Sequence, residues 1–523
     1  MVGVAGKSKG CVTCKKRRIK CDEGKPRCRK CDKSGYACGG YKTDLQFVNT
    51  STAPLPKEPD QSSSKTTYIN NTPVRVVPRI RTATVPTGLS LIAFQSDVCL
   101  SYMLQNFVWR TYGTGWLEPA AQKSLDSLSS QAVTALSSSF FGVSHHQEDI
   151  QLTGSMQYGN VLGRLRPALA DPRKPGFESL IIPILILLMH ASYEEDQSAA
   201  IAHVKGLMMV LHMAGPRSFQ REPVRSAFES ARATLTTSFL IARQPLFLAH
   251  QDWKTIPWEL DPWCKSEQNI LADILVDVPG FLADDTKLQQ HDDILVHVPG
   301  FLADDTKLQQ HADTPAHTAL LQRVESSLST LYIWRFTWEI ANPTAAYETS
   351  SPTTSPPNRR VIARRLLFRT HSQAAEILLY NAIQMWLIGL LLRLSPTTAS
   401  STISAIATLA AAFTNFPNPI SSGALRLPHD THSLRDPAIE ICRAFEFQIT
   451  APEQNKQSSL FFLFPLGIAW PVLEREDAYR AWMREMLDSW PVTRGYAIGR
   501  NKWFGKYYLP KVFGRRRRYE GVL

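Results

Sequence analysis

Six cysteines within the first 38 residues constrain this 523-residue chain more than any other feature. Their spacing is C-x2-C-x6-C-x6-C-x2-C-x6-C, two copies of one three-cysteine unit joined by six residues. Six thiolates cannot supply two separate tetrahedral zinc sites, because those sites need eight ligands. Two zinc ions can each be four-coordinate only if two of the six sulfurs bridge them. The predicted zinc ligands are Cys11, Cys14, Cys21, Cys28, Cys31 and Cys38.

Positive charge is concentrated in the same segment. Residues 1–43 hold thirteen Lys or Arg against three acidic residues, and so carry ten of the twelve net positive charges of the chain. Six thiolates and two zinc ions would leave this module at about +8. The stretch between the second and third cysteines is strongly basic, whereas residues 32–37 are nearly neutral. The first half is therefore expected to face DNA. Its candidate contacts are Lys15, Lys16, Arg17, Arg18 and Lys20.

Residues 11–38 resemble the fungal six-cysteine binuclear zinc cluster of the galactose-regulator type, a DNA-binding module. Pro26, ahead of the fourth cysteine, matches the proline of the inter-unit turn in that family. The resemblance implies two zinc ions and recognition of CGG-type triplets in the major groove of double-stranded DNA. Guanine offers paired acceptors there, so Arg17 and Arg18 are expected at or near the bases. The three lysines of the stretch are expected at phosphates.

The cysteines allow three other interpretations. A disulfide framework suits a secreted chain, and residues 1–10 lack the apolar run of a signal peptide. A metallothionein-like metal store would lack the ordered spacing and the basic segment. A zinc module that serves as a protein-docking adaptor, without specific DNA binding, stays open as the alternative function. A regulator that binds DNA only when a small molecule occupies the body also stays open.

The composition divides the chain into four parts. Ser, Thr and Pro dominate the second part, which shows no helical period and no apolar heptad, and so predicts a flexible linker without a coiled coil. The last part begins with Arg515–Arg518, a candidate nuclear-import signal that favours a nuclear location. The predicted domains are residues 1–41, the zinc-cluster domain; 42–88, the linker; 89–514, a large all-helical regulatory domain; and 515–523, a basic tail.

The fold class is therefore predicted as mainly α, because helical periodicity continues through the third part. This region resembles the fungus-specific regulatory domain that follows such zinc clusters, on short stretches near Ala202–Gly206, Arg243–Pro245, Trp253–Trp258 and Phe464–Ala469. The resemblance implies a regulator of a gene set, often a secondary-metabolite cluster, that contacts the transcription machinery. Pairing of two chains through this region is a further expectation. Helices are predicted over Leu89–Phe107, Phe177–Met189, Ala199–Met213, Arg359–Leu394, Pro437–Thr450 and Val472–Trp490.

One internal repeat interrupts this region. Asp273–His291 and Asp293–His311 differ only where Asp277 in the first copy corresponds to His297 in the second. Two near-identical copies indicate a tandem duplication within residues 273–312, and not a solenoid, which needs more units. We expect a surface segment between two helices; an acidic activation segment is the alternative.

No motif for catalysis is found in the sequence, so the chain is not expected to be an enzyme. His145-His146 is expected in an exposed turn, and the remaining cysteines, at 99, 264 and 442, are expected as buried thiols. The apolar run Leu180–Met189 is too short to cross a membrane. The longer run Ile377–Leu394 contains Asn, Gln and Arg, so a core helix of a soluble protein, with no membrane partner, is expected.

Overall fold

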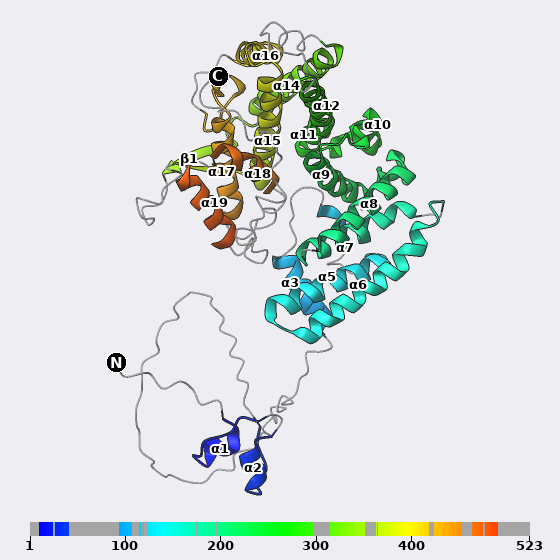
Figure 1. Cartoon of the computed structure of the whole chain (residues 1–523), viewed down its shortest axis with the longest axis vertical. Helices are drawn as coiled ribbons and strands as arrows, with labels where there is room; N and C mark the ends of the chain where they lie inside the picture. Colours follow the sequence, from blue (N-terminus) through cyan, green and yellow to red (C-terminus); the bar gives the residue numbers. More distant parts are fainter. Residues whose placement is uncertain are drawn as a thin grey trace, which may run out of the picture. The chain divides into compact units, whose positions relative to one another are not determined.

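A computed structural model gives the architecture of the chain (Figure 1). The chain divides into two compact units, residues 1–85 and 86–523, which are described separately. The predicted linker, Pro26, residues 297–312 of the repeat and the C-terminal arginines all lie outside the described residues. The structure describes residues 10–24, 27–40, 94–106, 114–117, 119, 124–173, 176–194, 196–296, 314–350, 362, 364–417, 423–450, 463–473 and 476–489.

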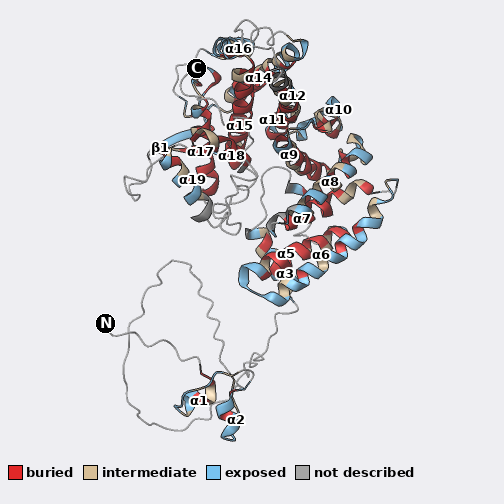
Figure 2. Cartoon of the chain, in the orientation of Figure 1, coloured by how far each residue is buried: buried red, intermediate tan, exposed pale blue. Residues whose placement is uncertain are grey.

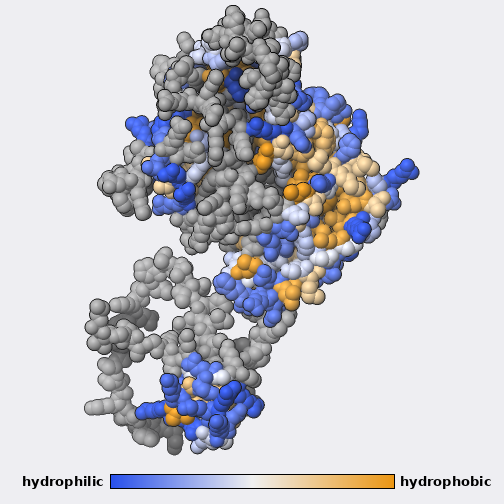
Figure 3. All heavy atoms as spheres, viewed as in Figure 1, coloured by the Kyte–Doolittle hydropathy of each residue, from blue (hydrophilic) through white to orange (hydrophobic). Residues whose placement is uncertain are grey.

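The N-terminal unit contains two short helices, α1 (Val12–Lys16) and α2 (Arg29–Lys33). The cysteines are the hydrophobic cluster of its described residues. A segment this small cannot bury enough apolar surface to fold by itself, so metal ligation must supply the folding energy. Figure 3 shows that the described surface of the unit is largely hydrophilic.

The second unit is helical and holds two hydrophobic cores. In the first core, α5 lies along α6, and α7 packs against both α5 and α8. The elements of this half are α3 (Gln95–Asn106), η2 (Thr114–Leu117), α5 (Ser127–His145), α6 (Glu148–Leu169), η3 (Phe177–Leu180), α7 (Ile181–Tyr193), α8 (Gln197–Ala214), η4 (Pro216–Phe219), α9 (Val224–Ala242), η5 (Phe247–Ala249), α10 (Gln251–Thr255), η6 (Ile256–Trp258) and η7 (Pro262–Cys264).

The second core is built around α15, which packs against α14 and α17 (Figure 2). Helix α9 joins the two halves, because Phe228 lies in the first core and Leu240 in the second. The elements of this half are α11 (Glu267–Leu275), α12 (Val278–Val296), α14 (Pro315–Ala341), β1 (Ala346–Ser350), β2 (Arg364–Phe368), α15 (His371–Leu394), α16 (Ala399–Phe413), η10 (Pro428–Asp430), α17 (Arg435–Thr450), α18 (Leu463–Leu473) and α19 (Asp477–Ser489).

Side-chain caps fix where several of these helices begin. Asp126 accepts hydrogen bonds from the backbone N–H groups of residues 128 and 129 at the start of α5. Asp196, Ser266, Thr314 and Thr370 cap α8, α11, α14 and α15 in the same way. Each cap satisfies an N–H group that has no partner within its own helix, and is worth about 1 kcal/mol.

The mainly α fold is as predicted, but the body is not wholly helical. Residues 364–368, which the helical periodicity predicts as part of a helix beginning at Arg359, form strand β2 and pair antiparallel with β1. Leu366 and Phe368 are buried while Arg364 is exposed. This alternation is typical of a strand with one buried face. The helix begins later than predicted, after the Thr370 cap.

Helix α15 is the one described helix long and apolar enough to cross a membrane by length and composition, and 89% of its apolar window is buried inside the protein. Two of its buried polar residues, Glu376 and Gln384, have hydrogen-bond partners within the core. Gln384 donates to Thr431 Oγ1 at 3.3 Å, and Glu376 accepts a hydrogen bond from Trp338 Nε1 at 2.8 Å. These contacts support the prediction of a core helix.

The first copy of the repeat is not the surface segment that was expected. It spans the end of α11 and most of α12, and Val278, Phe281 and Leu282 are buried in the second core. Asp273 pairs with the fully buried Arg232 at 2.6 Å, and both carboxylate oxygens of Asp277 accept from Lys254 Nζ at 2.7 Å. The first copy is therefore part of the core.

The isolated cysteines and histidines are only partly as predicted. Cys99 and Cys442 are buried, but Cys264 is exposed on η7, so the prediction of three buried thiols was wrong there. His145 ends α5 and His146 follows it with φ 54°, and both are exposed in a turn, as expected.

Candidate metal centre and nucleic-acid interface

The metal centre consists of two half-units related by a shift of 17 residues along the chain. Helix α1 begins directly after Cys11, and α2 begins directly after Cys28. Each of these cysteines caps its helix, because its sulfur accepts a 3.3 Å hydrogen bond from the backbone N–H of Cys14 or Cys31. The C-x2-C spacing thus puts two sulfurs of each half-unit on one helical turn.

The sulfur positions fit two tetrahedral metal ions. A tetrahedron with zinc–sulfur bonds of about 2.3 Å has sulfur–sulfur edges of about 3.8 Å. The sulfur of Cys11 lies 3.7 Å from that of Cys28 and 3.8 Å from that of Cys31, and the sulfurs of Cys14 and Cys28 are 3.6 Å apart. These distances match the expected edge of such a tetrahedron.

Two cysteines belong to both ligand sets. One set is Cys11, Cys14, Cys21 and Cys28, and the other is Cys11, Cys28, Cys31 and Cys38. Within each set the four sulfur atoms lie within 4.8 Å of one another. The shared members are the first cysteine of each half-unit, so Cys11 and Cys28 are positioned to act as the bridging thiolates. The sequence required two bridging sulfurs but could not say which ones.

Backbone N–H groups surround the outer sulfurs in matching ways. Cys21 accepts from the N–H of Cys11 at 3.4 Å, and Cys38 accepts from the N–H of Cys28 at 3.5 Å. Such hydrogen bonds stabilise negative charge on thiolate ligands. Asp22 joins the two halves, because its Oδ2 accepts from the N–H of Arg29, in the first turn of α2, at 2.9 Å.

The predicted DNA contacts gather at the C-terminal end of α1. Lys15, Lys16, Arg18 and Lys20 are exposed, whereas Arg17 is half-buried. The Arg17 guanidinium carbon lies 3.8 Å from the centre of the Tyr36 ring, so this side chain spans the two half-units. A cation–π contact of this kind contributes about 0.5–1 kcal/mol at an exposed site. Arg17 therefore has a structural partner within the module.

Arg18 has an unusual backbone conformation. Its φ of 54° is left-handed, and the corresponding position of the second half-unit, 17 residues later, is Gly35 with φ 66°. Glycine adopts this conformation without penalty, whereas a residue with a Cβ atom pays about 1–2 kcal/mol. The first half-unit thus retains a long cationic side chain where the fold by itself favours glycine.

Sequence reasoning missed the cations of the second half-unit. Arg29, Lys30 and Lys33 are exposed on or beside α2, so both short helices carry positive charge. These residues lie on α2, partly outside the nearly neutral stretch 32–37. The 17-residue shift would have found one of them, because it aligns Lys33 with Lys16.

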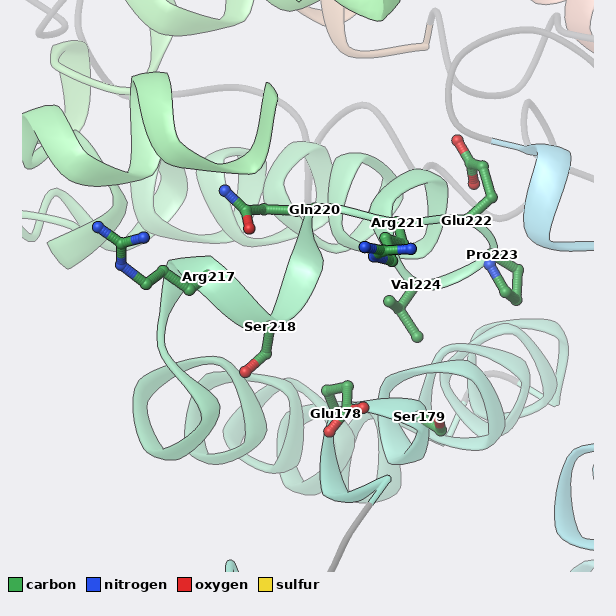
Figure 4. Close-up of a pocket in the computed structure, with 9 residues that line it drawn as sticks. All are labelled: Glu178, Ser179, Arg217, Ser218, Gln220, Arg221, Glu222, Pro223 and Val224. Atoms are coloured by element: carbon green, nitrogen blue, oxygen red, sulfur yellow. The ribbon is translucent and has the colours of Figure 1, made fainter. Parts of the chain in front are cut away.

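The helical body offers a shallow cavity of about 280 Å³ (Figure 4). Its lining includes Glu178, Arg217, Arg221 and Glu222, of which all but the first are exposed. Binding sites for small molecules are mostly apolar and enclosed. This cavity lacks those properties, so it gives no support to a ligand-binding body.

Comparison with known proteins agrees with this geometry. A six-thiolate site with two bridging sulfurs defines a binuclear zinc module. Residues 9–46 match the fungal Zn(2)-Cys(6) binuclear cluster domain. The domain binds two zinc ions.

Curated relatives share short segments with the chain. The aspercryptin biosynthesis cluster-specific transcription regulator of Emericella nidulans is 41% identical over 71 residues, which cover 13% of this chain and 12% of the relative. The white-opaque regulator 2 of Candida albicans is 61% identical over 33 residues, or 6% and 7%. The arginine metabolism regulation protein II of Saccharomyces cerevisiae is 47% identical over 38 residues, or 7% and 4%. The chain thus matches only about an eighth or less of their length. No solved structure gives a significant match.

Proposed function

We propose that this chain is a zinc-dependent, sequence-specific transcription factor of RNA polymerase II genes that binds double-stranded DNA through its first half-unit. In this proposal α1 enters the major groove at a CGG-type triplet. The observation that carries the proposal is the cluster of exposed cations at the end of α1, held on a small scaffold that two zinc ions make rigid.

Arg18 is the proposed base-reading residue. A guanidinium group can donate two hydrogen bonds to the O6 and N7 atoms of guanine, the commonest specific contact in the major groove. Strained backbone conformations cluster at functional sites, where another requirement outweighs their cost. The left-handed Arg18, opposed to Gly35 in the other half-unit, fits that pattern and supports a role for its side chain in recognition.

The lysines are proposed to bind phosphates. Lys15, Lys16 and Lys20 are exposed around the same helix end, and an ammonium group interacts with phosphate oxygens as a point charge. Arg17 is proposed to lie close to the bases while it remains stacked on Tyr36. The exposed cations of α2 would add sequence-independent attraction to the DNA backbone.

The wider role proposed here is that of a nuclear regulator. One relative is named for a biosynthesis cluster and another for arginine metabolism, so control of a gene set, including a secondary-metabolite cluster, is the expected output. The helical body would contact the transcription machinery. A protein-docking adaptor is the competing function. An adaptor would show no DNA sequence preference, so substitution of the five basic residues would change none.

Substitution of two neighbouring basic residues tests the proposal on the full-length, zinc-loaded protein. Lys16→Ala should weaken binding to all DNA sequences alike and lower the slope of log affinity against log salt by about one. Arg18→Ala should cost about 1–3 kcal/mol on the preferred site and much less on random DNA. Lys33→Ala, at the position of the second half-unit that corresponds to Lys16, is the control. It should weaken binding to the preferred site less than Lys16→Ala does.

Arg18→Gly separates recognition from structure. Glycine relieves the left-handed strain, so this variant should hold its zinc at least as tightly as the wild type while it loses preference for the triplet. Equal losses on specific and random DNA for both Arg18 variants would refute the assignment. Absence of any preferred sequence for the wild-type protein would favour the adaptor.

A further inference from the structure

Helix α6 has an exposed face that the fold of one chain does not explain. Its opposite side packs on α5, where a Cβ atom on Gly154 would lie 2.4 Å from Ser139 Oγ, and Val161 and Leu165 on that side are buried. On the outer side, Leu152 and Met156 are 62% and 64% exposed. Figure 2 shows the exposed side of α6 along its length.

Two further glycines lie on this outer face. A Cβ atom added to Gly159 or Gly163 would meet nothing within 4 Å, so neither residue is required by packing inside the chain. A glycine in a helix interior destabilises the helix relative to alanine. Leu152, Met156, Gly159 and Gly163 follow one another at intervals of four, three and four residues, the spacing of a seam between two paired helices.

We propose that two copies of this chain associate through α6, with the two helices antiparallel about a twofold axis. In this arrangement Leu152 of one copy lies over Gly163 of the other, and Met156 lies over Gly159. Each large side chain thus meets a glycine that leaves room for it, and both pairs are centred on the same point between residues 157 and 158. A surface that complements itself about one axis is what a twofold dimer requires.

Charge on α6 has the same symmetry. Glu148 and Arg166 are both exposed, lie on the same flank of the outer face, and are almost equally far from the proposed axis. Antiparallel pairing therefore brings Glu148 of each copy beside Arg166 of the other, twice in the dimer. Parallel pairing would instead align like charges at the two ends. This complementarity favours a second copy over an unrelated partner.

The contact is small, and the proposed dimer is accordingly weak. Residues 148–166 form about 28 Å of helix, and one helix pair buries less than the roughly 800 Å² per partner of a standard interface. We expect a dissociation constant on the order of micromolar. Two DNA half-sites would strengthen such a dimer by raising its effective concentration, but self-association in the absence of DNA does not depend on the proposed function.

Sedimentation velocity of the full-length, zinc-loaded protein from about 1 to 100 µM tests the proposal. The wild type should shift from monomer to dimer over this range. Leu152→Lys should remain monomeric, whereas Leu409→Lys, at a leucine of similar exposure on α16, should dimerise like the wild type. A wild type that stays monomeric throughout, or a dimer that survives Leu152→Lys, would overturn the proposal.

Two further variants separate pairing from folding. Gly163→Leu should stabilise the monomer, because leucine favours a helix more than glycine does, and should block the dimer by filling the gap. Glu148→Arg and Arg166→Glu should each weaken dimerisation about tenfold or more, and the double variant should restore it, because the pairs re-form with opposite polarity. Failure of the double variant to recover, with both singles impaired, would reject the antiparallel arrangement.

Discussion

The duplicated segment allows a test in which two deletions give chains that differ at one residue. Removal of residues 292–311 keeps the first copy with Asp277, and removal of residues 273–292 keeps the second copy with His297 in the same position of the sequence. Every other residue of the two shortened chains is identical. Any difference in stability between them therefore reports on the residue at position 277 alone.

The structure sets the expected magnitude. Lys254 donates to both oxygens of Asp277 at 2.7 Å, and the two side chains are 14% and 27% exposed. Hydrogen bonds between charged groups contribute about 1.5–3 kcal/mol. Burial raises the pKa of Asp277 even though Lys254 acts to lower it, which means that desolvation offsets part of the attraction. We therefore expect the shortened chain with histidine to be less stable than the one with Asp277 by the lower end of that range, about 1.5–2 kcal/mol.

The chain that keeps Asp277 should be about as stable as the wild type. Its deletion starts within α12 beyond Val278, Phe281, Leu282 and Asp285, so these buried residues of the first copy keep their place in the sequence. Urea unfolding followed by far-ultraviolet circular dichroism, at equal protein concentrations, measures both values. Equal stability of the two shortened chains would refute the role of the Lys254–Asp277 pair. Collapse of both would show that the second copy also belongs to the core.

Three further predictions concern buried charges and the metal centre. Burial raises the pKa of Glu440 to about 7 from its ordinary value of 4.5, so the folded state binds the extra proton and stability falls as the pH rises through that window. Glu440→Gln keeps an acceptor for the Arg426 N–H, and in urea titrations it should be more stable than the wild type by up to about 3 kcal/mol near pH 8, with little difference near pH 4.5. A stability difference between Glu440→Gln and the wild type that does not change with pH would contradict the raised pKa of Glu440. Asp273→Asn should cost about 2–3 kcal/mol in the same assay, because the fully buried Arg232 loses its charged partner; a loss below about 0.5 kcal/mol would show that the bonds of Arg232 to Asn269 suffice. Native mass spectrometry should count two zinc ions on the wild type and a loss of zinc in Cys14→Ala; one or three zinc ions on the wild type would exclude the shared-thiolate arrangement.

The metal centre was largely predictable because covalent spacing and ligand chemistry determine it. C-x2-C puts two sulfurs on one turn, and ligand counting requires two bridging sulfurs. Local spacing does not say which sulfurs bridge, because that depends on how the half-units pack. The left-handed conformation of Arg18 was also not predicted, although alignment of the half-units, which pairs it with Gly35, could have indicated it.

The helical body was predictable in class and less so in detail. Apolar periodicity found the helices at 95–106, 181–193 and 197–214, since each has a face in the core. It failed at residues 364–368, because five residues with two arginines and a run of apolar side chains fit either a strand or the first turns of the helix that follows. Strand pairing with β1 decides between them, and that contact is not local.

The position of the repeat in the fold was predicted wrongly for a different reason. Near-identity of two copies suggested an insertion outside the core, and that inference was wrong for the first copy. A duplication within a helix leaves one copy able to occupy the original core position. The ion pairs of Asp273 and Asp277 with distant residues show which copy does so here, and such tertiary partners cannot be read from a local pattern.

Binding sites selected from a random double-stranded DNA library with the purified, zinc-loaded full-length protein would show whether the two-zinc module reads DNA sequence. We expect enrichment of a CGG-type triplet, and loss of that enrichment both after zinc chelation and in Arg18→Ala. Retention of DNA without any enriched sequence, or enrichment that survives removal of zinc, would contradict it.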